Sequence, residues 1–108
     1  MKPGTKVRLI LDEFRKLDPE LPAQQAVALI VISERAGMTQ QKVAAQLGVS
    51  KSSANRIFNK LADEGTDGKV GLGLIKILPG DADARERQAY LTPTGVEFLA
   101  NLCRIVEA

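Results

Sequence analysis

Residues 40–57 read Gln40-Gln41-Lys42-Val43-Ala44-Ala45-Gln46-Leu47-Gly48-Val49-Ser50-Lys51-Ser52-Ser53-Ala54-Asn55-Arg56-Ile57. The stretch has the spacing of two short helices that meet at a tight turn. Ala44 is small where the helices would approach closely, and Gly48, four places later, tolerates the positive φ that the turn requires. Thr39 and Ser50 are suitable N-caps. The apolar residues placed to join the helices are Val43, Leu47, Val49, Ala54 and Ile57. Together these features predict a helix-turn-helix, and the alternative is an ordinary helical hairpin that binds no ligand.

The sequence before this motif predicts two further helices. Apolar residues at spacings of three and four predict an amphipathic helix over about residues 5–17. A second helix is expected from Pro22, because proline suits a first helical turn, to about Ala36, with Gly37 as its stop. Its middle, Ala26–Ile32, is apolar on every face and could form a buried strand. The length between Pro22 and Gly37 favours a helix surrounded by other elements.

The sequence after the motif predicts a β-hairpin and a final helix. The second helix of the motif is expected to reach about Glu64, where Gly65 would stop it. A loop, two strands and the last helix are expected, in that order, over about residues 66–73, 74–78, 87–91 and 93–106. The predicted fold class is therefore mainly α with a small β-hairpin, a winged helix-turn-helix. We expect one domain over residues 1–108, with its helix-turn-helix at about 39–64 and its wing at about 74–91.

The composition argues against several classes of protein. The 108 residues include no histidine and a single cysteine, Cys103. This removes the commonest general base, any internal disulfide, and zinc sites built on His and Cys clusters. We therefore expect no catalytic residues, no metal, no cofactor and no enzyme activity. The longest apolar run is far too short to span a bilayer, and the first residues do not resemble a signal peptide. A cytoplasmic protein is expected.

Positive charge is concentrated in the motif. The net charge is only +2, but no Asp or Glu occurs between Met38 and Lys60, a segment that also holds Lys42, Lys51 and Arg56. A locally basic segment in a nearly neutral domain is typical of a surface that faces phosphates. The alternative is a solvated helical face with a chance excess of lysine.

The second helix of the motif, the recognition helix, separates into two faces. The residues that share its apolar side, and should pack inward, are Ala54, Ile57, Phe58 and Leu61. The side chains left for solvent are Lys51, Ser52, Asn55, Arg56, Asn59 and Lys60. These types bind double-stranded DNA, since Arg pairs with guanine, Asn with adenine, and Ser or Lys with phosphates or base edges. We predict contacts with base edges for Ser52, Asn55 and Arg56. Contacts with phosphates are predicted for Lys42, Lys51 and Lys60.

Three segments of the chain carry a resemblance to a known family. They are Gln40–Leu61, Asp83-Ala84-Arg85 and Leu91-Thr92-Pro93-Thr94-Gly95. Together they are similar to the winged-helix multiple antibiotic resistance regulators, the MarR family, over about residues 21–102. The resemblance implies a wing hairpin in which Arg85 enters the minor groove of DNA and Asp83 helps to hold the wing. An arginine suits that groove because narrow grooves concentrate negative potential. The alternative for Asp83 and Arg85 is a plain ion pair in a hairpin loop.

The chain departs from the family pattern at three places. Ala84 stands where the wing often carries an additional arginine. Residues 66–73 look like an insertion between recognition helix and wing, and Lys69 within it could add a contact with the DNA backbone. Both terminal helices are short, although members of the family usually dimerise through long ones.

The last helix carries two apolar stripes. One consists of Val96, Leu99, Cys103 and Val106, and the other of Phe98, Leu102 and Ile105. Because one stripe is enough to dock on the domain, we predict that the second pairs with the first helix or with another protomer. A homodimer formed in this way would fit two half-sites of an operator. Packing of both stripes within one chain is the alternative. Cys103 is expected to be a small buried residue.

The expected function is transcriptional regulation through sequence-specific binding of double-stranded DNA, by a repressor that occupies its operator. One alternative is a winged-helix module that binds proteins, although the lack of acids over residues 38–60 counts against it. Another is a DNA-binding protein of plasmid or phage replication or partition, which the sequence does not separate from regulation. No residue marks a pocket for a small-molecule effector.

Overall fold

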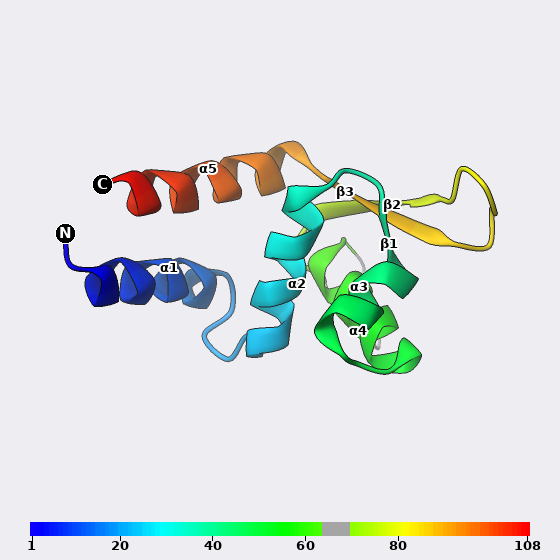
Figure 1. Cartoon of the computed structure of the whole chain (residues 1–108), viewed down its shortest axis with the longest axis horizontal. Helices are drawn as coiled ribbons and strands as arrows, with labels where there is room; N and C mark the ends of the chain where they lie inside the picture. Colours follow the sequence, from blue (N-terminus) through cyan, green and yellow to red (C-terminus); the bar gives the residue numbers. More distant parts are fainter. Residues whose placement is uncertain (64–69) are drawn as a thin grey trace.

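The structure is a computed structural model that describes residues 1–63 and 70–108. The elements in this part of the chain are α1 (Pro3–Leu17), α2 (Ala23–Glu34), β1 (Met38–Thr39), α3 (Gln40–Leu47), α4 (Lys51–Leu61), β2 (Ile75–Pro79), β3 (Arg87–Leu91) and α5 (Pro93–Glu107). In Figure 1, α1 and α5 lie side by side at one end of the molecule, and the β2–β3 hairpin extends at the other. The predicted fold class, a winged helix-turn-helix, is confirmed.

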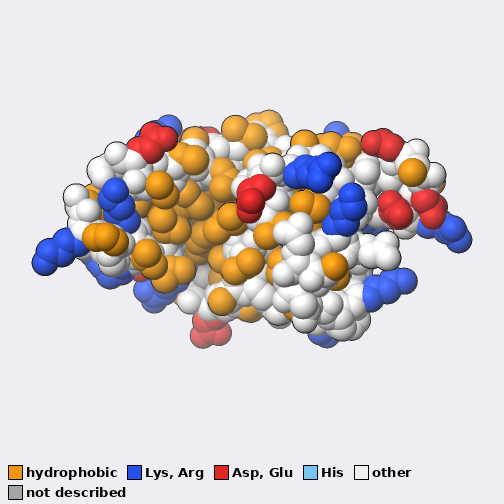
Figure 2. Space-filling model, viewed as in Figure 1, with side chains coloured by type: hydrophobic (Ala, Val, Ile, Leu, Met, Phe, Trp, Pro, Cys, Tyr) orange, Lys and Arg blue, Asp and Glu red, His pale blue; other side chains and the backbone are white. Residues whose placement is uncertain are grey.

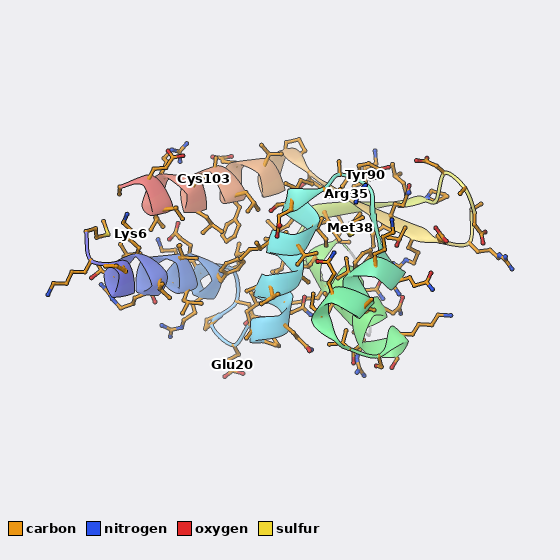
Figure 3. The ribbon with its side chains drawn as sticks, in the orientation of Figure 1. Lys6, Glu20, Arg35, Met38, Tyr90 and Cys103 are labelled. Carbon is orange, nitrogen blue, oxygen red and sulfur yellow. The ribbon has the colours of Figure 1, made fainter. Side chains whose placement is uncertain are left out.

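The hairpin belongs to a three-stranded antiparallel sheet with the order β1-β3-β2. The short strand β1 was not expected from the sequence. It places Met38 opposite Ala89 of the central strand. Gly37 leads into it with a φ of 81° and donates its N–H to the carbonyl oxygen of Ala89 over 3.0 Å. A Cβ atom at Gly37 would lie 3.1 Å from the hydroxyl of Tyr90, which Figure 3 places beside this turn. Gly37 thus forms the turn that leads into β1. It does not stop α2 directly, because α2 ends at Glu34, before the predicted Ala36.

The core lies between α2, the helix-turn-helix and the sheet. All four residues predicted for the inner face of α4 are buried: Ala54, Ile57, Phe58 and Leu61. The apolar segment of α2 is helical, as its length indicated, and contributes Leu29 and Ile32 to the core. It is not surrounded on every side, however, because Val27 and Ile30 are exposed.

The recognition helix α4 ends at Leu61, three residues before the predicted end. Ala62 already has extended backbone angles, with φ −84° and ψ −168°. The segment that leads into β2 is hydrogen-bonded to this end of α4. The backbone N–H of Leu72 donates to the carbonyl oxygen of Lys60, and that of Leu74 donates to the carbonyl oxygen of Leu61, both over 2.8 Å. Glu64, Gly65, the first part of the predicted 66–73 loop and its Lys69 lie outside the described residues.

One apolar stripe of α5 packs within the chain. Phe98 and Leu102 are buried, and the ring of Phe98 meets that of Phe14 of α1 edge to face, with centroids 5.0 Å apart. The other stripe lies mainly at the surface: Val96 and Val106 are 56% and 57% exposed, although Leu99 is half-buried against the core. Cys103 is exposed as well, so the expectation that it is buried was wrong. Figure 2 shows hydrophobic side chains gathered on this end of the molecule, over α1 and α5. None of the helices in the described ranges is long and apolar enough to cross a membrane.

Candidate nucleic-acid interface

Local hydrogen bonds fix the two helices of the motif. The Thr39 hydroxyl accepts from the backbone N–H of Lys42, and the Ser50 hydroxyl accepts from that of Ser53, each over 3.1 Å. Gly48 between the helices has φ 68° and ψ 34°, the left-handed conformation that glycine adopts without a steric penalty. Both predicted caps and the predicted turn glycine are therefore confirmed, and they set the angle at which α4 is presented.

The outer face of α4 carries exposed polar side chains at its N-terminal end. Lys51, Ser52, Asn55 and Arg56 are all exposed, as is Lys42 on α3. The Ser52 hydroxyl lies 3.2 Å from that of Ser50. The guanidinium of Arg56 donates to the Ser53 hydroxyl over a long 3.4 Å and carries no carboxylate partner among the described residues. This part of the helix therefore presents cations and hydrogen-bonding groups to solvent.

The C-terminal end of α4 is engaged by the protein itself. Lys60 is half-buried, and its Nζ lies 3.1 Å from Oδ2 of Asp18, in the turn that joins α1 to α2. The pKa of the Asp18 carboxyl is lowered first by the backbone N–H of Glu20, which donates to it over 3.0 Å, and then by Lys60. Lys60 therefore differs from Lys42 and Lys51, the other lysines predicted to contact phosphates, because those two are exposed and Lys60 is paired with Asp18.

The wing tip is organised by an ion pair between its two predicted residues. The Arg85 guanidinium donates from Nε and Nη2 to the two carboxylate oxygens of Asp83, over 3.2 and 3.0 Å, and the Arg85 backbone N–H donates to Oδ1 over 3.0 Å. These bonds lower the pKa of the Asp83 carboxyl. The Arg85 side chain is nevertheless 90% exposed, so it remains accessible to a partner.

Sequence reasoning missed Arg87, which lies at the start of β3. Its Nη1 donates to Oε1 of Gln40 over 3.0 Å and also to Oδ1 of Asn55, and its Nη2 donates to Oδ1 of Asn59 over 2.8 Å. Burial lowers the pKa of this guanidinium from its usual value, which is so high that the group stays charged. The partners lie 47, 32 and 28 residues away in sequence, so no local pattern could have indicated this cluster.

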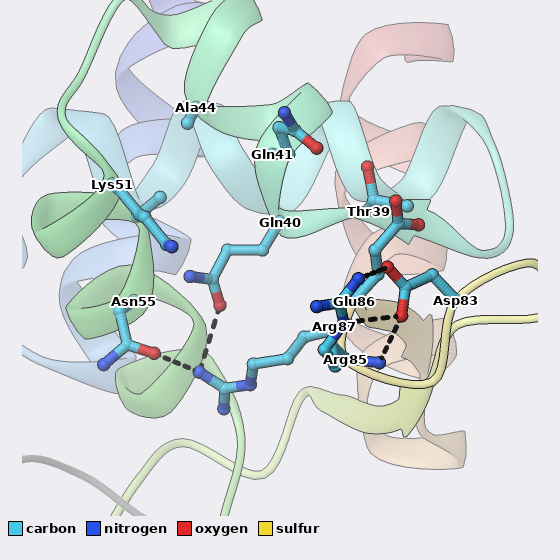
Figure 4. A pocket seen from close by; sticks show the side chains of 11 residues that line it. Thr39, Gln40, Gln41, Ala44, Lys51, Asn55, Asp83, Arg85, Glu86 and Arg87 are labelled. Carbon is cyan, nitrogen blue, oxygen red and sulfur yellow. Dashed lines mark hydrogen bonds and ion pairs between the residues drawn. The ribbon is translucent and has the colours of Figure 1, made fainter.

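A groove of about 610 Å³ runs between the helix-turn-helix and the wing (Figure 4). Of the residues predicted to bind DNA, it brings together Lys51, Asn55 and Arg85, with Asp83 beside them. Ser52 lines a shallower depression next to it, together with Lys51 and Asn55. The remaining predicted residues do not line the groove: Lys42, Arg56, Asn59 and Lys60. Gln40 and Arg87, which were not predicted, lie at its centre.

Comparisons with known proteins agree with this geometry. Residues 20–65 match the model of the MarR family. The MepR–DNA complex from S. aureus is similar in structure, with a TM-score of 0.76 and 17% identity, over 96% of this chain and 78% of that one. A MarR transcriptional regulator from Methanosarcina mazei Go1 has a TM-score of 0.70 and 18% identity, over 96% of this chain and 70% of that one.

A mutant of E. coli MarR complexed with operator DNA is also similar, with a TM-score of 0.70 and 23% identity, over 95% of this chain and 66% of that one. No curated protein matches the sequence. The predicted resemblance is thus confirmed: the chain has the winged-helix fold of MarR-family transcriptional regulators, and its residues 20–65 match the model of that family.

Proposed function

We propose that this chain is a transcriptional regulator that binds double-stranded DNA, with α4 in the major groove and the wing in the minor groove. The observation that carries the proposal is the charge on one face of the fold. Lys42, Lys51 and Arg56 form no ion pair within the described residues, and no acidic residue occurs in α3 or α4. Unpaired cations on a helix-turn-helix are suited to bind a polyanion such as DNA, and the exposed Arg85 lines the groove that Lys51 also lines.

Individual roles follow from position and chemistry. Arg56 and Asn55 lie on the exposed face of α4 and carry the donors that bind base edges, and Ser52 lies one turn before Arg56. Lys42 and Lys51 are exposed point charges, which suit phosphates. Arg85 is placed to enter the minor groove, where it would respond to groove width rather than to base identity.

The mode of action proposed is repression by occupancy of an operator. Structural relatives in complex with DNA, MepR of S. aureus and MarR of E. coli, support this reading. We further infer that the chain is one domain that acts by binding rather than by catalysis. Because its ligand would be DNA, we place its action in the cytoplasm.

A homodimer is part of the same proposal. The stripe of α5 that remains open holds Val96 and Val106, and α1 beside it exposes Val7 and Leu11. The stripe expected to pair with the first helix or with another protomer, around Phe98 and Leu102, is covered by α1, so the proposed dimer surface moves to the opposite stripe. Sedimentation equilibrium at micromolar concentration should give twice the monomer mass. The variant V96E/V106E should then give the monomer mass, and a monomer for the unmodified protein would contradict the dimer.

Binding to DNA is tested by a fluorescence anisotropy titration over a range of salt concentrations. Selection from a pool of duplexes with a random centre supplies the probe. The logarithm of affinity should fall linearly with the logarithm of salt concentration, because bound phosphates release counterions. The double variant K42M/K51M should reduce the slope by about 1.8, or about 0.9 for each lost phosphate contact. Failure to bind any duplex at low salt would reject the proposed function and leave a protein-interaction module as the alternative.

A further inference from the structure

Arg87 holds three amide side chains of the DNA-facing helices in a fixed orientation. It extends from the first position of β3 toward the N-terminal end of α3 and the middle of α4, as Figure 4 shows for Gln40 and Asn55. The amide oxygens of Gln40, Asn55 and Asn59 all accept hydrogen bonds from its guanidinium. Asn55 and Asn59 are one helical turn apart, so the two nitrogens of one guanidinium can hold both.

The chemistry of the guanidinium decides which way each amide points. A guanidinium donates five N–H bonds and accepts none, so it can only face the oxygen of an amide. Hydrogen bonds to an ionised group are stronger than neutral ones. No carboxylate among the described residues forms an ion pair with Arg87, so the amides are its hydrogen-bonding partners in this part of the structure. The NH₂ group of each amide is therefore turned away from the cation.

This orientation matters most at Asn55, which is exposed on the face of α4 proposed to meet DNA. An asparagine that recognises adenine uses both of its polar atoms, accepting from N6 and donating to N7. Because its oxygen faces Arg87, Asn55 turns its NH₂ group away from the cation, so the groups directed outward are N–H donors. Guanine offers two acceptors in the major groove, N7 and O6, whereas adenine sets a donor beside its acceptor.

We propose that Arg87 is a positioning residue that makes Asn55 a donor-only reader of the major groove, so that it selects guanine rather than adenine. The inference rests on the proposed function, since it concerns how this face reads a duplex. It replaces the expectation from residue type alone, which paired Asn55 with adenine. A purely structural role for Arg87, as a link from β3 to α3 and α4, would affect all sequences equally.

The test compares base preference in four proteins: the wild type, R87M, N55A and the double variant. Duplexes selected by the wild-type protein from a random pool supply the probe, and the position read by Asn55 is the one at which N55A loses its preference. Affinities for the four single-base versions of that duplex are then measured by anisotropy. The wild type should prefer guanine to adenine there by about fivefold, the factor for one net hydrogen bond. R87M should shift the ratio toward adenine by about the same factor. In the N55A background, R87M should not change the preference.

Two results would overturn the inference while leaving DNA binding intact. One is an equal loss of affinity by R87M for all four duplexes, which would make Arg87 only a structural link. The other is a wild-type preference for adenine at this position. If no duplex is selected at all, the proposed function fails and the inference fails with it. Thermal unfolding shows whether R87M is folded. If it is not, R87Q replaces it, because a neutral amide can accept from the NH₂ group of Asn55 as well as donate to its oxygen, so the orientation is no longer fixed and the ratio should again move toward adenine.

Discussion

Nζ of Lys60 and Oδ2 of Asp18 lie 3.1 Å apart, which joins the end of the recognition helix to the turn between α1 and α2. The same carboxylate accepts the backbone N–H of Glu20 through its other oxygen, over 3.0 Å. The Glu20 bond lies within the α1–α2 turn, and the Lys60 ion pair holds that turn against α4. Lys60, which was predicted to bind a phosphate, therefore forms an ion pair within the protein instead. Its effects on DNA binding and on stability can both be measured.

Lys60 should contribute much less to DNA binding than Lys51. Both are lysines of α4, so K60M and K51M form a matched pair. K51M should lower the salt slope of binding by about 0.9, as expected for one lost phosphate contact. K60M should leave the slope nearly unchanged, because its charge is already paired with Asp18. Anisotropy titrations of both variants on one selected duplex decide the matter. Equal reductions would mean that Lys60 leaves Asp18 to bind DNA.

Stability should depend on the ionisation of Asp18. Its pKa is lowered in the folded protein, chiefly by the Glu20 N–H and then by Lys60. A lowered pKa stabilises the fold above the unfolded value of about 3.9, and this contribution is lost as the pH falls through the folded pKa. D18N should therefore have a lower Tm than the wild type at neutral pH, and the difference should vanish in strong acid. D81N, in the exposed hairpin loop, is the control and should show no difference at either pH. A Tm difference for D18N that persists in acid would assign the effect to something other than the charge.

Arg85 and Arg56 should affect DNA binding in different ways. R56A should reduce affinity by about 1–3 kcal/mol on the selected duplex and relax the preference at one base pair. R85A should weaken binding mainly where A·T-rich sequence flanks the site, because narrow minor grooves attract arginine. Neither variant should change Tm by much, since both side chains are exposed. The measurement uses the selected duplex, a single-base variant and a variant with G·C-rich flanks. Equal losses on all three would reduce both arginines to phosphate contacts.

Gly95 should not tolerate a side chain. It lies in the first turn of α5, where a Cβ atom would be 2.1 Å from the carbonyl oxygen of Leu74. G95A should destabilise the protein by at least about 1–3 kcal/mol, the usual cost of overpacking a buried position. The matched control is G4A in α1, where a Cβ atom would meet nothing within 4 Å. That change should instead stabilise the helix by about 0.5 kcal/mol. Urea unfolding measures both, and a stable G95A would show that α5 can move away from Leu74.

The parts of this fold that depend on local chemistry could be predicted from the sequence. The caps Thr39 and Ser50, the turn at Gly48 and the inner face of α4 follow from residue type and helical spacing alone. The strand β1 was missed because its two residues are too few for an alternating pattern. Arg87 and the Lys60–Asp18 pair were missed for another reason, since each depends on elements that become neighbours only after folding. The exposure of Cys103 depends on which stripe of α5 meets α1, and both stripes are apolar in sequence.

The central strand β3 has a mechanical consequence for the whole molecule. One of its ends carries Arg87, which holds the recognition helix, and the other precedes Thr92, the cap of α5. The strand pairs with β2 along its whole length and with β1 at Gln88 and Ala89, so it resists bending, and its five residues span about 13 Å at 3.3 Å per residue step. A displacement of α5 would therefore be transmitted to α4 through β3, because no flexible segment lies between the strand and either helix contact. In a dimer joined through α5, the spacing of the two recognition helices would be set by the stiffness of this short strand.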